Sequence, residues 1–186
     1  MPTVTQRRRL TAEDLACPGV PEKFVELVEG EAVEMTPGGK RHNRIASEFE
    51  FLFRAFCKSR PDLDYGGDND GFAIERDPDT VLSPDASLFR RREGAGTWMD
   101  FAPEIVVEVL SPSNSPMEIA FKRNRFFEAG TEQFWTVDLE RKRLEIHHRD
   151  GRLVLAEGGD VVEGEGIAEG LRVDLKEIFR ALEESR

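Results

Sequence analysis

The segment Ile105-Val106-Val107-Glu108-Val109-Leu110 decides the fold, because it is apolar on both faces of a strand except at one position. A run of this kind is typical of a central strand that is covered on both sides. Glu108 interrupts the run, and burying an unpaired carboxylate costs several kcal/mol at least. We therefore expect Glu108 to have a nearby cation, a hydrogen-bond network or a raised pKa. A simple salt bridge or an edge-facing position is the alternative.

A second acidic residue, Asp85, follows Pro84 at the start of the predicted strand 84–89. Strand alternation places Asp85 on the opposite side from Ala86. Taken alone, an Asp after Pro is as typical of a turn as of a site. If the strands of Asp85 and Glu108 are neighbours, their carboxylates meet, and such hard oxygen ligands suit Mg²⁺ or Mn²⁺.

A lysine, Lys122, lies on the second predicted helix, which follows the helix-starting segment 111–116. A turn of about 100° per residue places Lys122 in the same inward stripe as Ile119, Phe126 and Ala129. The ammonium then either points back at a carboxylate site or snorkels outward while the stem stays buried.

Two further residues are candidates for a site. His42 lies on the stripe of Ile45 and Phe49, near the start of the first long helix. It is a candidate for proton transfer or phosphate contact, with helix capping or packing as the alternative. Glu31 follows a predicted hairpin turn, where a carboxylate is usually solvated, so the pattern alone favours a surface position.

The remaining pattern predicts one domain, residues 21–186, behind a flexible polar lead-in, residues 1–20. A hairpin around Glu29-Gly30 precedes a helix from His42 to about Lys58, and a meander of antiparallel strands follows. We expect these strands at Leu63–Tyr65, Gly71–Glu75, Pro84–Phe89 and Ile105–Leu110. The later elements are the helix that ends at Ala129, a buried strand Phe134–Val137, a hairpin of Arg143–His148 and Arg152–Ala156, and a short helix from Leu175 to about Glu183 that Asp174 caps.

Composition restricts the functions that the chain can have. It has 186 residues, with 26 Lys+Arg against 37 Asp+Glu, for a net charge of −11. Affinity for DNA comes largely from neutralising phosphates, so this charge opposes a nucleic-acid function. Basic clusters at 40–44, 90–92 and 122–125 still allow a local basic face.

The chain also lacks several recognisable signals. No segment reaches the roughly 18 apolar residues that a bilayer span needs, and Cys17 and Cys57 lack the paired spacing of a zinc site. We expect a cytoplasmic protein with two reduced thiols and no membrane partner. Because no phosphate-cradling glycine loop is present, we expect no organic cofactor.

Four motifs occur in a specific order along about residues 22–180. They are Glu26-Leu27-Val28-Glu29-Gly30-Glu31 followed by His42, then Ser83-Pro84-Asp85, then Val107-Glu108-Val109-Leu110-Ser111-Pro112-Ser113, and then Lys122 ahead of Ala129-Gly130-Thr131-Glu132-Gln133-Phe134-Trp135. In this order they resemble the Uma-type restriction endonuclease family, a branch of the PD-(D/E)XK nuclease superfamily.

This resemblance implies a fold and a chemistry. The fold is of mixed α/β (α+β) class, a restriction-endonuclease-like core in which a central mixed sheet is flanked by helices and carries accessory β-hairpins. Asp85, Glu108 and a main-chain carbonyl near Val109 would bind Mg²⁺, with Mn²⁺ as a substitute, and Lys122 would orient a water or stabilise negative charge. Glu31 would complete the metal shell, and His42 would hold a phosphate or a carboxylate.

The sequence departs from the family pattern at two positions. The superfamily lysine stands two residues beyond the Glu, where this chain has Leu110, so Lys122 would supply the ammonium from the helix. Family members typically carry Tyr where this chain has Phe126, so a hydroxyl available in relatives is missing here.

Three functions compete at this stage. The first is a metal-dependent endonuclease that hydrolyses DNA phosphodiester bonds as a homodimer, because two-fold pairing is the simplest way to cut two strands with one kind of site. The alternative is a catalytically weak or inactive nuclease-fold module that binds nucleic acid or protein, which Leu110 and the negative charge favour. Acid/base hydrolysis of a sugar would leave Lys122 unexplained.

Overall fold

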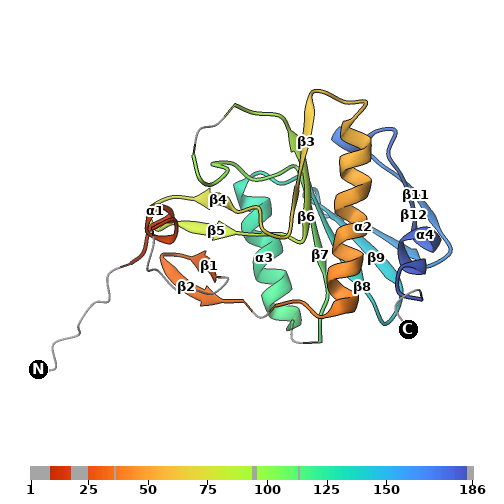
Figure 1. The fold of residues 1–186 in the computed structure, drawn as a ribbon, viewed down its shortest axis with the longest axis horizontal. Coiled ribbons are helices and arrows are strands. Elements are labelled where there is room, and N and C mark those ends of the chain that lie inside the picture. Colours follow the sequence, from red (N-terminus) through yellow and green to blue (C-terminus); the bar gives the residue numbers. More distant parts are fainter. Residues whose placement is uncertain (1–8, 18–24, 36, 94–95, 113, 184–186) are drawn as a thin grey trace, which may run out of the picture.

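A computed structural model describes residues 9–17, 25–35, 37–93, 96–112 and 114–183. Its centre is a six-stranded sheet with strand order β10-β9-β8-β7-β6-β3 (Figure 1). The strands are β3 (Leu63–Gly67), β6 (Ala86–Arg90), β7 (Ile105–Val109), β8 (Gln133–Asp138), β9 (Arg143–His148) and β10 (Leu153–Glu157). The pair β7 and β8 is parallel and the other neighbours are antiparallel, so the sheet is mixed.

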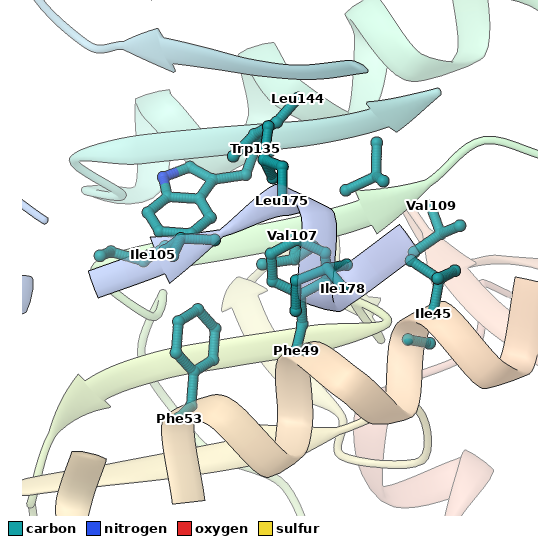
Figure 2. Packing of buried hydrophobic residues seen from close by; sticks show 14 of the residues in the cluster. Ile45, Phe49, Phe53, Ile105, Val107, Val109, Trp135, Leu144, Leu175 and Ile178 are labelled. Atoms are coloured by element: carbon teal, nitrogen blue, oxygen red, sulfur yellow. The ribbon is translucent and has the colours of Figure 1, made fainter. Parts of the chain in front are cut away.

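Two long helices cover the two faces of this sheet, as the apolar segment 105–110 predicts. Helix α2 (Lys40–Cys57) packs Ile45, Phe49 and Phe53 against one face. Figure 2 shows these side chains meeting Ile105, Val107 and Val109 of β7 and Trp135 of β8, together with Leu175 and Ile178 of α4 (Leu175–Arg180). Helix α3 (Pro116–Ala129) covers the other face, where Phe126 packs with Val106 and Phe134.

A second, four-stranded sheet has strand order β2-β1-β5-β4. Its strands are β1 (Val25–Val28), β2 (Glu31–Glu34), β4 (Phe72–Glu75) and β5 (Thr80–Leu82). The predicted hairpin is confirmed, with Glu29 and Gly30 at φ values of 50° and 79° in the turn. Apolar side chains of this sheet, among them Val28, Ile74 and Leu82, belong to the same cluster as Phe126, so the sheet is attached to α3.

The predicted single meander is wrong, because β4 leaves the central sheet. Between β3 and β6 the chain turns into the second sheet, where β4 pairs with β5 and β5 pairs with β1 through Leu27 and Val81. Strand β5 was not predicted. Hairpin β9–β10 extends the central sheet, and β11 (Val161–Glu163) and β12 (Arg172–Asp174) form a separate two-stranded sheet beside the 3₁₀ turn η1 (Gly166–Ala168).

Part of the predicted lead-in is ordered. Helix α1 (Ala12–Leu15) begins with a capping box at Thr11, and the Ala12 side chain is fully buried. The main-chain N–H of Ala12 donates to Asp79 Oδ2 at 2.8 Å, which fixes α1 on the second sheet. Residues 1–8 and 18–20 of the predicted lead-in lie outside the described residues.

The other predicted elements agree with the structure. Helices α2, α3 and α4 begin within two residues of the predicted starts, and Asp174 caps α4 by accepting from the N–H groups of Lys176 and Glu177. The mixed α/β class with a central mixed sheet and flanking helices is confirmed. Cys17 and Cys57 are free thiols. Among the described residues, no helix has the length and apolar character needed to cross a membrane.

Candidate active site

Two carboxylates meet where β7 ends. In the antiparallel pair β6 and β7, Ala86 lies opposite Val107, and one further step along this register places Asp85 opposite Glu108. The main-chain N–H of Val109 donates to Asp85 Oδ2 at 2.6 Å, which anchors Asp85 to the end of β7. Both carboxylates are only 7% exposed. Helices α2 and α3 both begin at this end of the sheet (Figure 1).

The Lys122 side chain reaches this site from α3. Its Nζ lies 2.8 Å from Glu108 Oε1 and 2.9 Å from Oε1 of a third acid, Glu26 on β1. The ammonium also donates to the Ser83 carbonyl oxygen at 3.4 Å. With 12% of its side chain exposed, Lys122 is largely buried, so the snorkelling alternative does not apply.

The buried acids dominate the electrostatics of the site. The pKa of Glu108 is raised to about 8, because burial, together with the negative charges of Asp85 and Glu26, outweighs the attraction of Lys122. Burial opposes the charge on Lys122, yet the attraction of Glu108 and Glu26 holds its pKa above the ordinary value. Glu26 and Glu108 therefore share one ammonium, and a further cation would be stabilised here.

Helix α2 contributes His42 from its first turn. His42 Nε2 lies 3.3 Å from Asp85 Oδ2, and Nδ1 lies 3.2 Å from the side-chain oxygen of Asn43. The hydrogen bond to Asp85 raises the pKa of His42 to about 9, although burial opposes the charge. Two oxygen acceptors around one ring favour the doubly protonated imidazolium. The positive charge of His42 thus compensates the negative charge of the Asp85 carboxylate, as Lys122 does for Glu108.

Glu31 is not part of this group. It lies on β2 with its side chain exposed, and its partner across the hairpin is Val28. The acid that the β1–β2 hairpin supplies is Glu26, which is 7% exposed and also accepts the main-chain N–H of Ser83 at 3.0 Å. Our sequence reasoning missed Glu26. The signal was present, because Glu26 interrupts the apolar strand Val25–Val28 as Glu108 interrupts β7.

A cavity of about 420 Å³ opens beside Asp85. Asn43, Ser47 and Glu50 of α2 form one wall, and residues 67–70 of the β3–β4 turn form the other. Burial raises the pKa of Asp68 in this turn, and the negative charge of Asp85 adds to the effect. The cavity gives access to Asp85, but its walls are acidic.

The donor set fits a divalent metal such as Mg²⁺. Asp85 and Glu108 are hard oxygen ligands on neighbouring strands, and the buried excess of negative charge favours a cation. Within the described ranges, no three His, Cys, Asp or Glu side chains converge on one point. A set made of two carboxylates and one main-chain carbonyl does not require a third side chain.

Comparisons with known proteins place the chain in a family. The model of the Uma2 family, described as "Putative restriction endonuclease", matches residues 12–176. This chain belongs to the Uma2 family. The resemblance inferred from the sequence motifs is confirmed, and the matched range includes every residue of the site.

A solved structure shares the fold of this chain. The chain is similar to a crystal structure described as a "putative nuclease belonging to DUF820" from Anabaena variabilis ATCC 29413. The sequence identity is 21%, the TM-score is 0.76, and the match covers 93% of this chain and 99% of the other. No curated protein matches the chain.

The structure also gives physical meaning to the two departures from the family pattern. The ammonium of Lys122 reaches Glu108 from α3, so Leu110 at the usual lysine position leaves no gap in the charge balance. Phe126 is fully buried, with its ring centroid 6.2 Å from that of Phe134. In this Uma2 protein the position serves packing.

Proposed function

We propose that this protein is a metal-dependent endonuclease that hydrolyses phosphodiester bonds of DNA. The observation that carries the proposal is the meeting of Asp85, Glu108 and Lys122, from two strands and a helix, at one end of the central sheet. Membership of the Uma2 family supports the nuclease class.

In this proposal Asp85, Glu108 and the main-chain carbonyl of Val109 hold Mg²⁺, with Mn²⁺ as a substitute. When bound, the metal would supply Lewis acidity for the scissile phosphate and lower the pKa of an attacking water. Val109 positions Asp85 through its main-chain N–H, which leaves Asp85 Oδ1 available as a ligand.

The remaining residues act through charge and position. Lys122 would orient the attacking water or stabilise negative charge on the phosphate, because its ammonium lies beside Glu108. Glu26 forms a second ion pair with that ammonium. His42 orients Asp85 and, as an imidazolium in the first turn of α2, could also contact a phosphate of the substrate.

Two-fold pairing is the simplest way to cut both strands of a duplex with one kind of site, so we propose that the protein acts as a homodimer. Light scattering at working concentration tests this part separately. A monomeric species that cuts both strands at one position would contradict it.

Conversion of supercoiled plasmid tests the proposed activity. With Mg²⁺ the protein should give nicked or linear DNA, and EDTA should stop the reaction. Asp85→Asn and Glu108→Gln keep the size of each side chain, so we expect folded variants, by circular dichroism, with at least about 100-fold lower rates. Unchanged rates in both variants would overturn the site assignment.

The competing function is a nuclease-fold module that binds nucleic acid or protein without turnover. The acidic cavity walls favour it. Calorimetry separates the two functions, because a protein that binds neither Mg²⁺ nor Mn²⁺ at millimolar concentration cannot be a metal-dependent nuclease.

A further inference from the structure

A second cationic side chain of α3, Arg125, contacts the sheet that carries Glu26. Its guanidinium forms an ion pair with Glu29 in the β1–β2 turn, and its Nη1 lies 3.1 Å from Glu75 Oε1 on β4. The guanidinium carbon also lies 5.1 Å from the centroid of the Phe121 ring. Arg125 is 20% exposed, so these contacts are partly shielded from water.

The partners of Arg125 are bonded to one another. Thr80 on β5, which is fully buried, donates its hydroxyl to Glu75 Oε2 at 2.9 Å. The same hydroxyl oxygen accepts the main-chain N–H of Glu29 at 3.2 Å. Arg125 therefore binds the β1–β2 turn, β4 and β5 as one connected unit.

Two of the ion pairs between α3 and this sheet have the same spacing along the sequence. Lys122 contacts Glu26, and Arg125, three residues further along α3, contacts Glu29, three residues further along the chain. The apolar contacts between the sheet and α3 are non-directional. A planar guanidinium held by two carboxylates fixes both distance and direction.

We propose that Arg125 is a positioning residue that fixes the second sheet on α3, so that Glu26 holds the Lys122 ammonium against Glu108. Arg125 touches none of the candidate metal ligands, and it acts through the placement of β1. The consequence for DNA cleavage rests on the proposed nuclease function, whereas the consequence for Lys122 does not.

The test follows the Lys122 ammonium directly by ¹⁵N NMR of lysine Nζ groups, with Lys122→Met to assign the signal. A buried, doubly ion-paired ammonium should exchange its protons slowly with water. In Arg125→Met we expect this exchange to accelerate by about tenfold or more. Arg125→Lys keeps the positive charge but loses the planar guanidinium that can bind two carboxylates at once, so we expect an intermediate exchange rate. If Arg125→Met does not fold, Arg125→Lys serves as the test variant.

Arg76 provides a matched control. It forms ion pairs with Glu13, Asp79 and Asp100 and so loses a comparable set of contacts in Arg76→Met. Because these contacts do not involve α3, we expect the Lys122 signal to stay unchanged. An unchanged Lys122 signal in Arg125→Met, or an equal change in both variants, would overturn the inference.

Cleavage kinetics separate this inference from the proposed function. If the protein cuts DNA, Arg125→Met should lower kcat by about tenfold or more with little change in KM, because the substrate contacts remain. If the wild type does not cut DNA and the Lys122 signal still responds, the nuclease proposal fails and the positioning role stands.

Discussion

The ammonium of Lys122 already occupies the place between two acids where a cation is stabilised. It contacts Oε1 of both Glu26 and Glu108, so a metal bound to Glu108 must share that carboxylate with a positive neighbour. Metal binding and lysine placement are therefore coupled at a single residue, with Coulomb repulsion between the two cations opposing the metal.

Replacing Lys122 should separate metal binding from catalysis. In Lys122→Met we expect Mn²⁺ to bind at least about fivefold more tightly, because the repulsion is removed, while cleavage is lost. Calorimetry with Mn²⁺ measures the first effect, and the plasmid assay measures the second. Weaker Mn²⁺ binding in this variant would contradict the coupling.

The two glutamates of the β1–β2 hairpin should differ sharply in function. Glu26→Gln removes the charge that holds Lys122, so we expect cleavage to fall by about tenfold or more. Glu31→Gln changes an exposed side chain outside the site and should keep activity within about twofold. The reverse order of effects would show that the hairpin supplies the acid from Glu31.

Most of the candidate site could be predicted from the sequence, because its polar residues lie within apolar patterns that indicate burial. Glu108, Asp85, Lys122 and His42 each break or extend an apolar pattern, and the structure brings these four residues together. Glu26 was missed because β1 is short and its partner strand β5 is distant in sequence. The contacts that bury Glu26 come from Ser83 and Lys122, which are also far along the chain.

At the scale of elements, one face of α2 packs into the hydrophobic core and the other face is exposed to solvent. Phe49 is fully buried and packs edge-on against Trp135, with ring centroids 6.2 Å apart. Phe51, two residues further along the same helix, is 66% exposed. The two phenylalanines therefore form a matched pair with the same helix propensity and opposite burial.

Truncation of these two side chains should have very different effects on stability. We expect Phe49→Ala to lower the free energy of unfolding by about 3–5 kcal/mol and Phe51→Ala by less than about 1 kcal/mol. Urea denaturation measures both. Similar losses for the two variants would contradict the orientation of α2 on the central sheet.

Helices and hairpins were more predictable than the division into two sheets. The stripe of α2 and the Glu29-Gly30 turn are local patterns, so the sequence alone indicates them. The choice of partner strands is non-local, since β5 has only the residues Thr80–Leu82 and joins β1 from far along the chain. The side-chain pattern of a strand does not specify which strand pairs with it.

At the scale of the whole molecule, a net charge of −11 opposes DNA binding, and part of that charge lines the cavity beside Asp85. Glu50, Asp68 and Asp70 stand on the cavity walls, where an approaching phosphate would be repelled. If DNA enters here, these acids weaken its binding and limit the affinity of the site.

Neutralising the cavity walls should strengthen DNA binding. In a Glu108→Gln background that prevents cleavage, Glu50→Gln, Asp68→Asn and Asp70→Asn together should lower the Kd for a labelled duplex by at least about threefold at low salt. Fluorescence anisotropy measures the Kd. Neutralising Glu157, Glu163 and Glu169, which are exposed and do not line the cavity, controls for net charge. Equal effects of the two sets would contradict entry through the cavity.

The central claim is that Asp85 and Glu108 form a metal site that Lys122 completes, and a crystal structure of the protein soaked in Mn²⁺ tests it most directly. We predict anomalous density shared by Asp85 and Glu108, with metal–oxygen distances of about 2.0–2.4 Å and the Lys122 ammonium nearby. Saturating Mn²⁺ that leaves Asp85 and Glu108 without density, with Lys122 still joining Glu26 to Glu108, would contradict the claim.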